Sequence, residues 1–217
     1  KIAAIAANTL GVNTARVHIE TTNTLRVPNA SPTSASTGAD LNGMATQKAC
    51  LQLLERLRKF AAKKMNCQDI NDIQIKDDFV YLKNVKTDYR WETLVFDAYW
   101  DRIDLSAHDF YATPDLHFNR DTETGKPFAY YAFGASLIEV EIDCIKSTFD
   151  IISINIIHDV GKSISPEIDR GQIEGAVIQG IGWATIEQIK YAKNGRMLTA
   201  VNSYKIPDIK FITKNFN

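Results

Sequence analysis

The chain has 217 residues, of which 45% are hydrophobic and 24% are charged, and its formal net charge is −1. This composition is ordinary for a soluble globular protein, and the balanced charge argues against a nucleic-acid or membrane-surface partner. No apolar run reaches 18 residues, so we expect no membrane-spanning helix.

The N-terminal part predicts two helices with a strand and a loop between them. Residues 1–10 place apolar side chains at helical spacing, and Gly11 is a natural helix stop. The alternation over 16–22 predicts a short strand, and 23–38 reads as a loop. A long helix is then expected from Asp40 to about Lys64. Its apolar stripe consists of Cys50, Leu54, Leu57 and Ala61.

The middle of the chain gives weaker signals. Residues 66–91 are polar and mixed, with one short strand predicted at 79–82. Residues 91–100 predict a short helix, and 103–110 return to an extended pattern.

The C-terminal part predicts a hairpin followed by a helix. Within 128–160, two runs of alternating Ile or Val with polar residues flank a turn at 144–149, which is typical of antiparallel strands. A helix is expected over about 166–190, with Pro166 suited to its first turn. Because strands and helices mix without regular βα alternation, the expected fold class is α+β, with mixed helices and antiparallel strands.

Residues 27–40, VPNASPTSASTGAD, form the segment of greatest functional interest. Small, polar and turn-forming residues leave backbone N–H groups and hydroxyls free for an anionic ligand, and no bulky side chain keeps that ligand away. A solvated Ser/Thr linker has the same composition, so composition alone leaves both interpretations open.

A second segment, GQIEGAVIQGIGWAT at 171–185, places small residues on one helical stripe. Gly171, Gly175 and Gln179 recur at i, i+4 spacing, and Gly182 lies one turn further on. Glycine in a helix costs about 1 kcal/mol relative to Ala, which makes sense where something approaches the backbone closely. A Gln amide both donates and accepts, which suits a heterocyclic or oxo-bearing ligand. Tight packing against another element explains the stripe equally well.

Other reactive residues give no clear site. Cys50, Cys67 and Cys144 are an odd number without C-x-x-C spacing, which argues against a zinc or iron–sulfur site and favours a reducing, cytoplasmic setting. His158 and Asp159 are adjacent on an extended chain and therefore point to opposite sides, so we interpret His158 as a structural histidine with its hydrogen bonds satisfied. No metal-ligating set of side chains is expected.

Several segments, in this order, resemble the molybdenum-cofactor-binding region of xanthine dehydrogenases and aldehyde oxidases. The resemblance covers nearly the whole chain, and the S-P-T-x-A-S form is similar to the xanthine dehydrogenase branch. The stretch from AHDFYATPDL to GKPFAYYAFG resembles the separate molybdopterin-binding subunit of bacterial enzymes. The matching segments are VPNASPTSAS (27–36), ADLNGMA (39–45), DLSAHDFY (104–111), TPDLHF (113–118), GKPFAYYAFGASLIEVEIDC (125–144), HDVGKSISPEIDRGQIEGAVIQGIGW (158–183) and YKIPD (204–208).

The resemblance implies a molybdenum hydroxylase, most similar to xanthine dehydrogenase, that hydroxylates an electrophilic carbon of a purine such as hypoxanthine or xanthine. Aldehyde oxidase, with an aldehyde substrate, is the alternative within the class. The implied cofactor is molybdenum–molybdopterin, as molybdopterin itself or its cytosine dinucleotide, with the metal held by the pterin dithiolene and not by protein side chains. FAD and 2Fe-2S clusters are expected on other domains or subunits of a cytoplasmic, oligomeric enzyme.

Residue by residue, the resemblance carries over to five positions. Ala35, Ser36 and Gly38 match loop positions that contact the pterin, and Gln179 matches a Gln that hydrogen-bonds the cofactor. Ser34 and Ala35 match positions that line the substrate pocket. Gly38 replaces a Ser of animal enzymes, so only a backbone contact is expected there.

Both ends of the chain look cut, because it begins with Lys1 and closes without a terminating signal. We therefore expect residues 1–217 to be a partial molybdopterin-cofactor-binding region. In the family, the catalytic base lies in a G-E-P-P motif after YKIP, and no catalytic residue is expected in this chain. A truncated, non-catalytic product that binds pterin or a partner subunit is the hypothesis of the other class.

Overall fold

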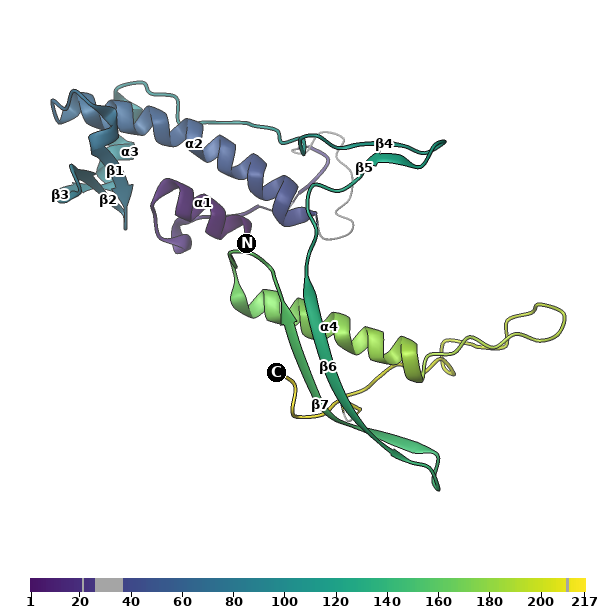
Figure 1. Ribbon diagram of the computed structural model, residues 1–217. Helices are drawn as coiled ribbons and strands as arrows, with labels where there is room; N and C mark the ends of the chain where they lie inside the picture. Colours follow the sequence, from purple (N-terminus) through teal and green to yellow (C-terminus); the bar gives the residue numbers. More distant parts are fainter. Residues whose placement is uncertain (21, 26–36, 210) are drawn as a thin grey trace. The chain divides into compact units, whose positions relative to one another are not determined.

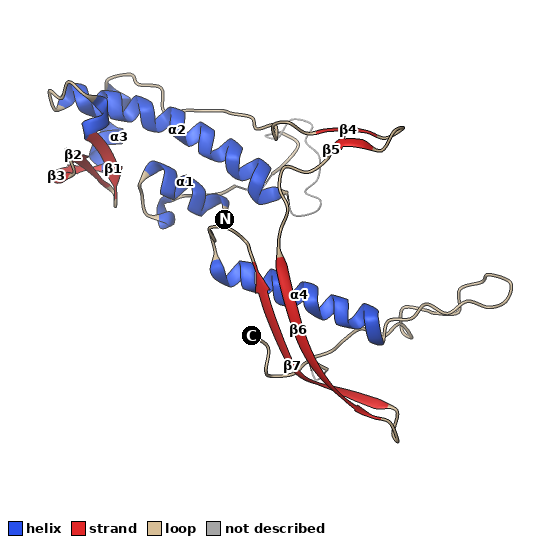
Figure 2. Cartoon of the chain, in the orientation of Figure 1, coloured by secondary structure: helices blue, strands red, loops and turns tan. Residues whose placement is uncertain are grey.

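The computed structural model describes residues 1–20, 22–25, 37–209 and 211–217, which form two compact units (Figure 1). The first unit spans Lys1–Ala129 and the second spans Tyr130–Asn217. Helices and antiparallel strands occur in both, which confirms the α+β class (Figure 2). Within the described ranges, no helix is long and apolar enough to cross a bilayer.

Four of the helices and strands of the first unit lie where the sequence predicts them. The helices expected at 1–10, 40–64 and 91–100 and the strand expected at 79–82 are all confirmed. The elements are α1 (Ile2–Leu10), α2 (Gly38–Lys64), β1 (Ile73–Lys76), β2 (Phe79–Leu82), β3 (Val85–Arg90), α3 (Trp91–Trp100), β4 (His117–Asn119) and β5 (Thr124–Lys126), with 3-10 turns at Thr14–Arg16 and Ile70–Asp72. Of these, β1, β3, β4 and β5 were not predicted.

The core of the first unit lies where the C-terminal half of α2, α3 and the β1–β2–β3 sheet meet. Leu57 of α2, Ile73 of β1, Val80 of β2 and Leu94 of α3 are each at most 2% exposed. The apolar stripe predicted for α2 supplies this contact through Leu57 and Ala61, whereas Cys50 is buried nearer its N-terminus. Packing of one helical stripe on a short antiparallel sheet therefore organises this unit.

Gly11 ends α1, as predicted, and does so in the left-handed region with φ 73°. A Cβ at this position would overlap the carbonyl group of Ile75, so the backbone of β1 approaches Gly11 closely. The Gly11 carbonyl also accepts a 3.2 Å hydrogen bond from the Asp78 N–H. Glycine is required here both for its φ and for the close approach.

The strand predicted over 16–22 is wrong for the described part of that range, residues 16–20 and 22. Residues 14–16 form a 3-10 turn in which the Asn13 side chain accepts a 2.9 Å hydrogen bond from the Ala15 N–H, and Val17–Glu20 have no regular structure. Arg16 is instead held by ion pairs with Asp78 and Glu92. No strand among the described residues pairs with this segment. The side-chain cap of Asn13 and the ion pairs of Arg16 therefore hold it in place of the hydrogen bonds of a sheet.

The second unit contains the predicted hairpin and helix with narrower bounds. Strands β6 (Gly134–Asp143) and β7 (Thr148–His158) pair antiparallel, and α4 runs over Pro166–Thr185. A third backbone segment joins β7, because Ile154 makes a parallel bridge with Phe216. Helix α4 ends five residues earlier than expected, where Ile186 and Glu187 both donate to the Gly182 carbonyl.

Candidate functional site

Three of the five predicted site residues, Ser34, Ala35 and Ser36, lie outside the described residues. Gly38 is the first residue of α2 and is half-buried. The side chain of the preceding Thr37 makes no capping hydrogen bond with α2. The first backbone N–H groups of a helix have no carbonyl one turn earlier to bond to. The N–H groups at Gly38 can therefore donate hydrogen bonds to a ligand at the positive end of this 27-residue helix.

Gln179 lies on an exposed face of α4 beside the glycine stripe. Its side chain makes no hydrogen bond with another described residue. A Cβ at Gly171 or Gly175 would meet no described atom within 4 Å. On this part of the helix the glycines therefore leave open space, and the tight-packing explanation does not hold among the described residues.

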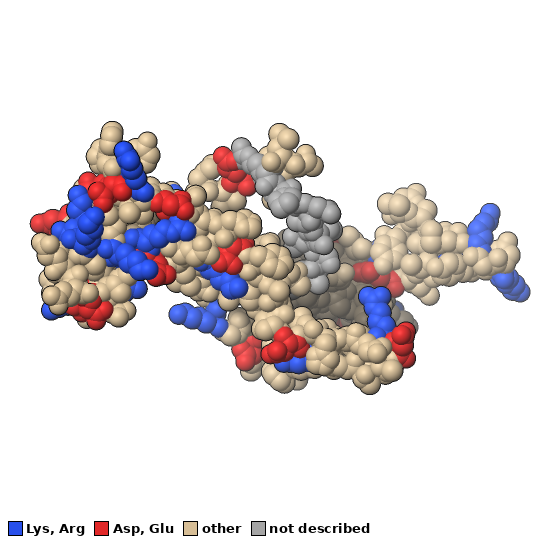
Figure 3. All heavy atoms as spheres, turned by 90° about the horizontal axis from the view of Figure 1, so that it is seen from above, with Lys and Arg blue, Asp and Glu red and all other residues tan. Residues whose placement is uncertain are grey.

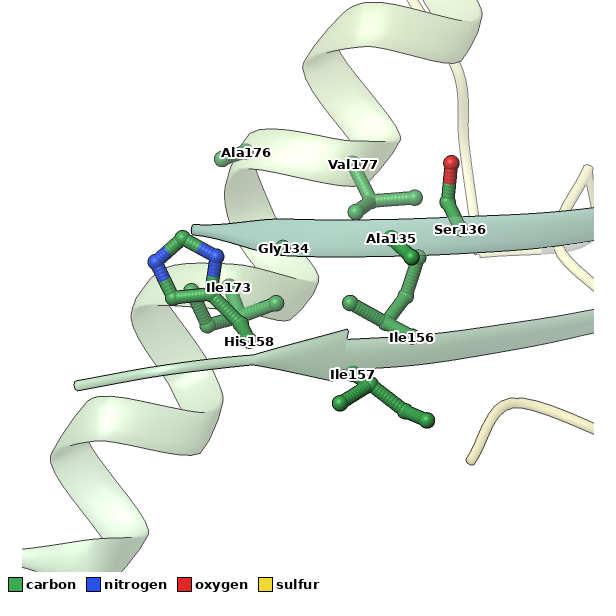
Figure 4. A pocket seen from close by; sticks show the side chains of 9 residues that line it. All are labelled: Gly134, Ala135, Ser136, Ile156, Ile157, His158, Ile173, Ala176 and Val177. Carbon is green, nitrogen blue, oxygen red and sulfur yellow. The ribbon is translucent and has the colours of Figure 1, made fainter. Parts of the chain in front are cut away.

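The opposite face of α4 is turned toward the β6–β7 hairpin. At about 100° per residue, Gly171 and Gly175 lie about 160° around the helix from Ile173, and Gln179 lies about 120° from it. Ile173, together with Val177, lines a cavity of about 430 Å³ beside the hairpin (Figure 4). The hairpin holds the helix on its apolar side and leaves the Gln179 side free.

Gly182 differs from the other glycines of the stripe, because it is buried. A Cβ there would fall 2.6 Å from Pro207 Cδ and would also overlap the Glu187 carboxylate. The interpretation as packing is therefore right for this one glycine. The contact between Pro207 and Gly182 brings the segment that contains YKIPD against the C-terminal turn of α4.

His158 lies at the end of β7, where its ring lines the same cavity (Figure 4). It is exposed, and its ring makes no hydrogen bond with another described residue. The interpretation of His158 as a satisfied structural histidine is therefore wrong. Its ring instead packs beside Gly134, where a Cβ would fall 2.7 Å from His158 Nδ1.

Charged side chains of the first unit are mixed in sign (Figure 3). Several basic residues of α2 pair with acids of the following segments, for example Arg56 with Asp104 at 2.9 Å and Lys63 with Asp101 at 3.6 Å. Hydrogen bonds from Ser106 hold the pKa of Asp104 below its usual value, with a smaller contribution from Arg56. These contacts are typical of a solvent-exposed helix face with ion pairs, and we interpret the basic face of α2 in this way.

No group of three or more His, Cys, Asp or Glu side chains gathers to hold a metal ion in the part of the chain that the structure describes. The polar groups beside the stripe are instead the donor and acceptor of the Gln179 side-chain amide, since the backbone N–H groups inside α4 bond to carbonyls of the preceding turn. This donor set fits a planar organic ligand with oxo and amide edges that approaches the backbone. A bare metal ion would need charged or imidazole ligands.

One contact at the end of α4 could not be found from the sequence. The Tyr204 hydroxyl donates a 2.5 Å hydrogen bond to Glu187 Oε2. The two residues are separated by an irregular segment, and no spacing rule connects them. The sequence marks Tyr204 only as part of the YKIPD segment and does not connect it with the end of α4.

Comparison with known proteins gives a consistent result along the chain. Residues 1–213 match the family model described as molybdopterin cofactor-binding domain. Xanthine dehydrogenase/oxidase of Gallus gallus is 39% identical over 217 residues, which is 100% of this chain and 14% of that protein. The Rattus norvegicus protein of the same name is 38% identical over 208 residues, which is 95% of this chain and 14% of that protein. The chain thus spans only 14% of the length of these curated relatives.

Solved structures show the same fold. Quinoline 2-oxidoreductase from Pseudomonas putida 86 matches with a TM-score of 0.82 and 23% identity, covering 100% of this chain and 27% of that chain. The Cu,Mo-CO dehydrogenase matches with a TM-score of 0.79 and 20% identity, covering 100% of this chain and 27% of that chain. At these identities the likeness concerns the fold alone.

Proposed function

The chain belongs to the family of molybdopterin cofactor-binding domains, and from this premise we propose that it forms part of the cofactor cradle of a molybdenum hydroxylase. The observation that carries the proposal is the free face of α4, where Gln179 lies beside two glycines with open space above them. A pterin edge needs a donor and acceptor pair and close backbone approach, and this face offers both.

The residues proposed to hold the cofactor come from two segments. Gln179 would hydrogen-bond it, and Gly38 would contribute backbone N–H groups at the start of α2. Ala35 and Ser36 are proposed to contact the pterin, and Ser34 with Ala35 to line the substrate pocket, on the resemblance of their segment alone. When bound, the cofactor supplies the redox-active metal centre, while the protein supplies orientation and hydrogen bonds.

The proposed substrate of the whole enzyme is a purine, hypoxanthine or xanthine. The support is the 36–39% identity to proteins named xanthine dehydrogenase or xanthine dehydrogenase/oxidase, together with the S-P-T-x-A-S form of the loop. An aldehyde would be the substrate if the protein belongs to the aldehyde oxidase branch. A panel of xanthine, hypoxanthine and aromatic aldehydes separates the two.

We propose further that the general base lies outside these 217 residues and that FAD and 2Fe-2S clusters are carried by other domains or subunits of an oligomeric, cytoplasmic enzyme. The cofactor form is proposed to be molybdopterin or its cytosine dinucleotide. Acid release followed by chromatography of the pterin identifies the form directly. Such an enzyme uses the present chain to position the cofactor.

The test compares Gln179→Ala with Gln188→Ala in the full-length protein. Gln188 is exposed and lies beyond the end of α4, so it serves as the matched amide control. Loss of a hydrogen bond to a strongly polar group costs about 1.5–3 kcal/mol, so Gln179→Ala is expected to lower molybdenum retention or turnover about ten- to a hundredfold. Molybdenum per protein, released pterin and steady-state kinetics are the readouts.

The outcome decides between the two classes of hypothesis. Full molybdenum occupancy and unchanged turnover in Gln179→Ala would show that this residue is not part of the cradle. A full-length protein that retains pterin but oxidises none of the substrates would instead favour a non-catalytic binding protein.

A further inference from the structure

The C-terminal end of α4 is closed by Glu187. Its backbone N–H donates a 2.9 Å hydrogen bond to the Gly182 carbonyl, which fixes Glu187 two residues beyond the last helical residue, Thr185. Its carboxylate lies directly over Gly182, at a place where a Cβ would overlap it. Glu187 is half-buried although it is charged. A carboxylate so placed needs a hydrogen-bond donor.

Tyr204 supplies this donor. It follows a segment that leads away from the end of α4 and back to it. Residues 188–203 form an exposed excursion with a few hydrogen bonds of its own, such as Leu198 N–H to the Lys190 carbonyl at 2.8 Å. The Tyr204 hydroxyl then donates a 2.5 Å hydrogen bond to Glu187 Oε2. This bond closes the excursion at its base.

Pro207 completes the contact three residues later. Its ring lies against Gly182, where a Cβ would fall 2.6 Å from Cδ and 2.8 Å from Cγ. Among residues 201–209, Pro207 alone is not exposed. The stiff ring fits only because position 182 carries no side chain.

We propose that Glu187, Tyr204 and Pro207 are positioning residues that clamp segment 204–208 onto Gly182 and thereby hold Gln179 in place for the cofactor. This inference rests on the proposed function of Gln179. Gln179 lies three residues before Gly182 and about 60° from it around the helix. The clamped segment therefore contacts α4 one turn C-terminal to Gln179, on the same side of the helix.

The chemistry of the clamp suits a fixed contact. A phenol that donates to a carboxylate makes a charge-assisted hydrogen bond, which is stronger than a neutral one. The same bond raises the pKa of Tyr204, with burial as a smaller cause, so the hydroxyl keeps its proton at neutral pH. The donor is thus present at neutral pH.

The experiment removes the hydroxyl with Tyr204→Phe in the full-length protein and uses Tyr191→Phe as the control. Tyr191 lies in the same excursion, is 61% exposed, and its hydroxyl makes no hydrogen bond with another described residue. Amide hydrogen exchange across 186–208 is expected to quicken about tenfold in Tyr204→Phe and to stay unchanged in Tyr191→Phe. Molybdenum retained after dialysis is expected to fall several-fold in Tyr204→Phe only, with the exchange of β6 and β7 unaltered.

A second pair tests the Pro207 contact by the same readouts. Gly182→Ala must displace the proline ring or the carboxylate, whereas Gly180→Ala enters open space two residues earlier on the same helix. We expect Gly182→Ala to reproduce the faster exchange and the molybdenum loss, and Gly180→Ala to show neither.

Each outcome is decisive. If exchange quickens but molybdenum retention does not change, the clamp is structural only and the proposal is overturned. If Tyr204→Phe matches Tyr191→Phe in both readouts, no clamp exists. A wild-type protein that binds no molybdenum refutes the proposed function and with it the link to the cofactor, while the exchange data still show whether the clamp forms.

Discussion

The Tyr89 hydroxyl donates a 2.9 Å hydrogen bond to Asp97 Oδ2, which ties the end of β3 to the helix that follows it. Lys64 Nζ lies 3.6 Å from the same carboxylate oxygen. Tyr89 is half-buried, and burial, followed by the bond to Asp97, raises the pKa of its hydroxyl well above the usual value. The core of the first unit is therefore sensitive to alkaline pH.

The sign of that sensitivity follows from the raised pKa of Tyr89. Its contribution to stability is fully present below the unfolded-state pKa of about 10 and is lost as the pH rises through the folded-state value. Tyr89→Phe is expected to cost about 1 kcal/mol at pH 8 and to flatten the decline in unfolding free energy above pH 10. Urea unfolding at pH 8 to 11 measures both effects. Tyr81→Phe is the control, and an equally steep decline in Tyr89→Phe would contradict the assignment.

Two adjacent cations of α2 are predicted to contribute very differently to stability. Arg58 is half-buried and donates to the carbonyls of Ile73 and Ile70 at 2.7 and 2.8 Å, whereas Lys59 pairs with Glu55 on the exposed surface. Arg58→Ala should cost about 1–3 kcal/mol because the carbonyls of buried Ile73 and half-buried Ile70 each lose a charged donor. Lys59→Ala should cost less than about 0.5 kcal/mol. Equal losses of stability in the thermal unfolding of Arg58→Ala and Lys59→Ala would show that the contacts of Arg58 with the two carbonyls do not stabilise the protein.

Helix α3 offers a test of the core itself. Leu94 is fully buried, at 0% exposed, while Phe96 on the same helix is 62% exposed. Leu94→Ala should destabilise the first unit by about 2–5 kcal/mol, through lost burial and a residual cavity. Phe96→Ala should cost less than about 1 kcal/mol. Chemical denaturation of both variants gives the comparison, and a small effect at Leu94 would mean that the site collapses around the change.

The purified 217-residue chain is predicted not to reduce a dye in the presence of xanthine. A positioned general base alone typically contributes about 10²–10⁴-fold to the rate, and we propose that this base lies elsewhere in the enzyme. The assay is xanthine-dependent dye reduction after incubation with the isolated cofactor. Turnover above the buffer background would refute the proposed location of the base.

Helical elements could be predicted well because their signals are local. Gly11 marked the end of α1, and it has the positive φ expected of a helix stop. Strands β1 and β3 were missed because their turns, at Asp77–Asp78 and Lys83–Asn84, adopt positive φ without glycine. Short strands joined by such turns carry too little alternation to be recognised.

The candidate site was predictable only in part. The four-residue spacing correctly placed Gly171, Gly175 and Gln179 on one face of α4, but it did not indicate which way that face is turned. It could not show that Gly182 is packed while the others face open space, because that depends on where Pro207 returns. Contacts across the irregular 188–203 segment depend on the path of the chain, and sequence periodicity contains no information about that path.

The two-stranded ribbon of β6 and β7 has a consequence for handling the protein. β7 has backbone partners on both sides, whereas β6 pairs only with β7 among the described residues. Leu137 and Ile142 on β6 are 71% and 68% exposed. An apolar strand with a free hydrogen-bonding edge is a template for strand addition by a neighbouring molecule. Preparations of this chain are thus expected to self-associate through β6 as concentration rises, and a lysine at an outward position of that strand is the natural remedy.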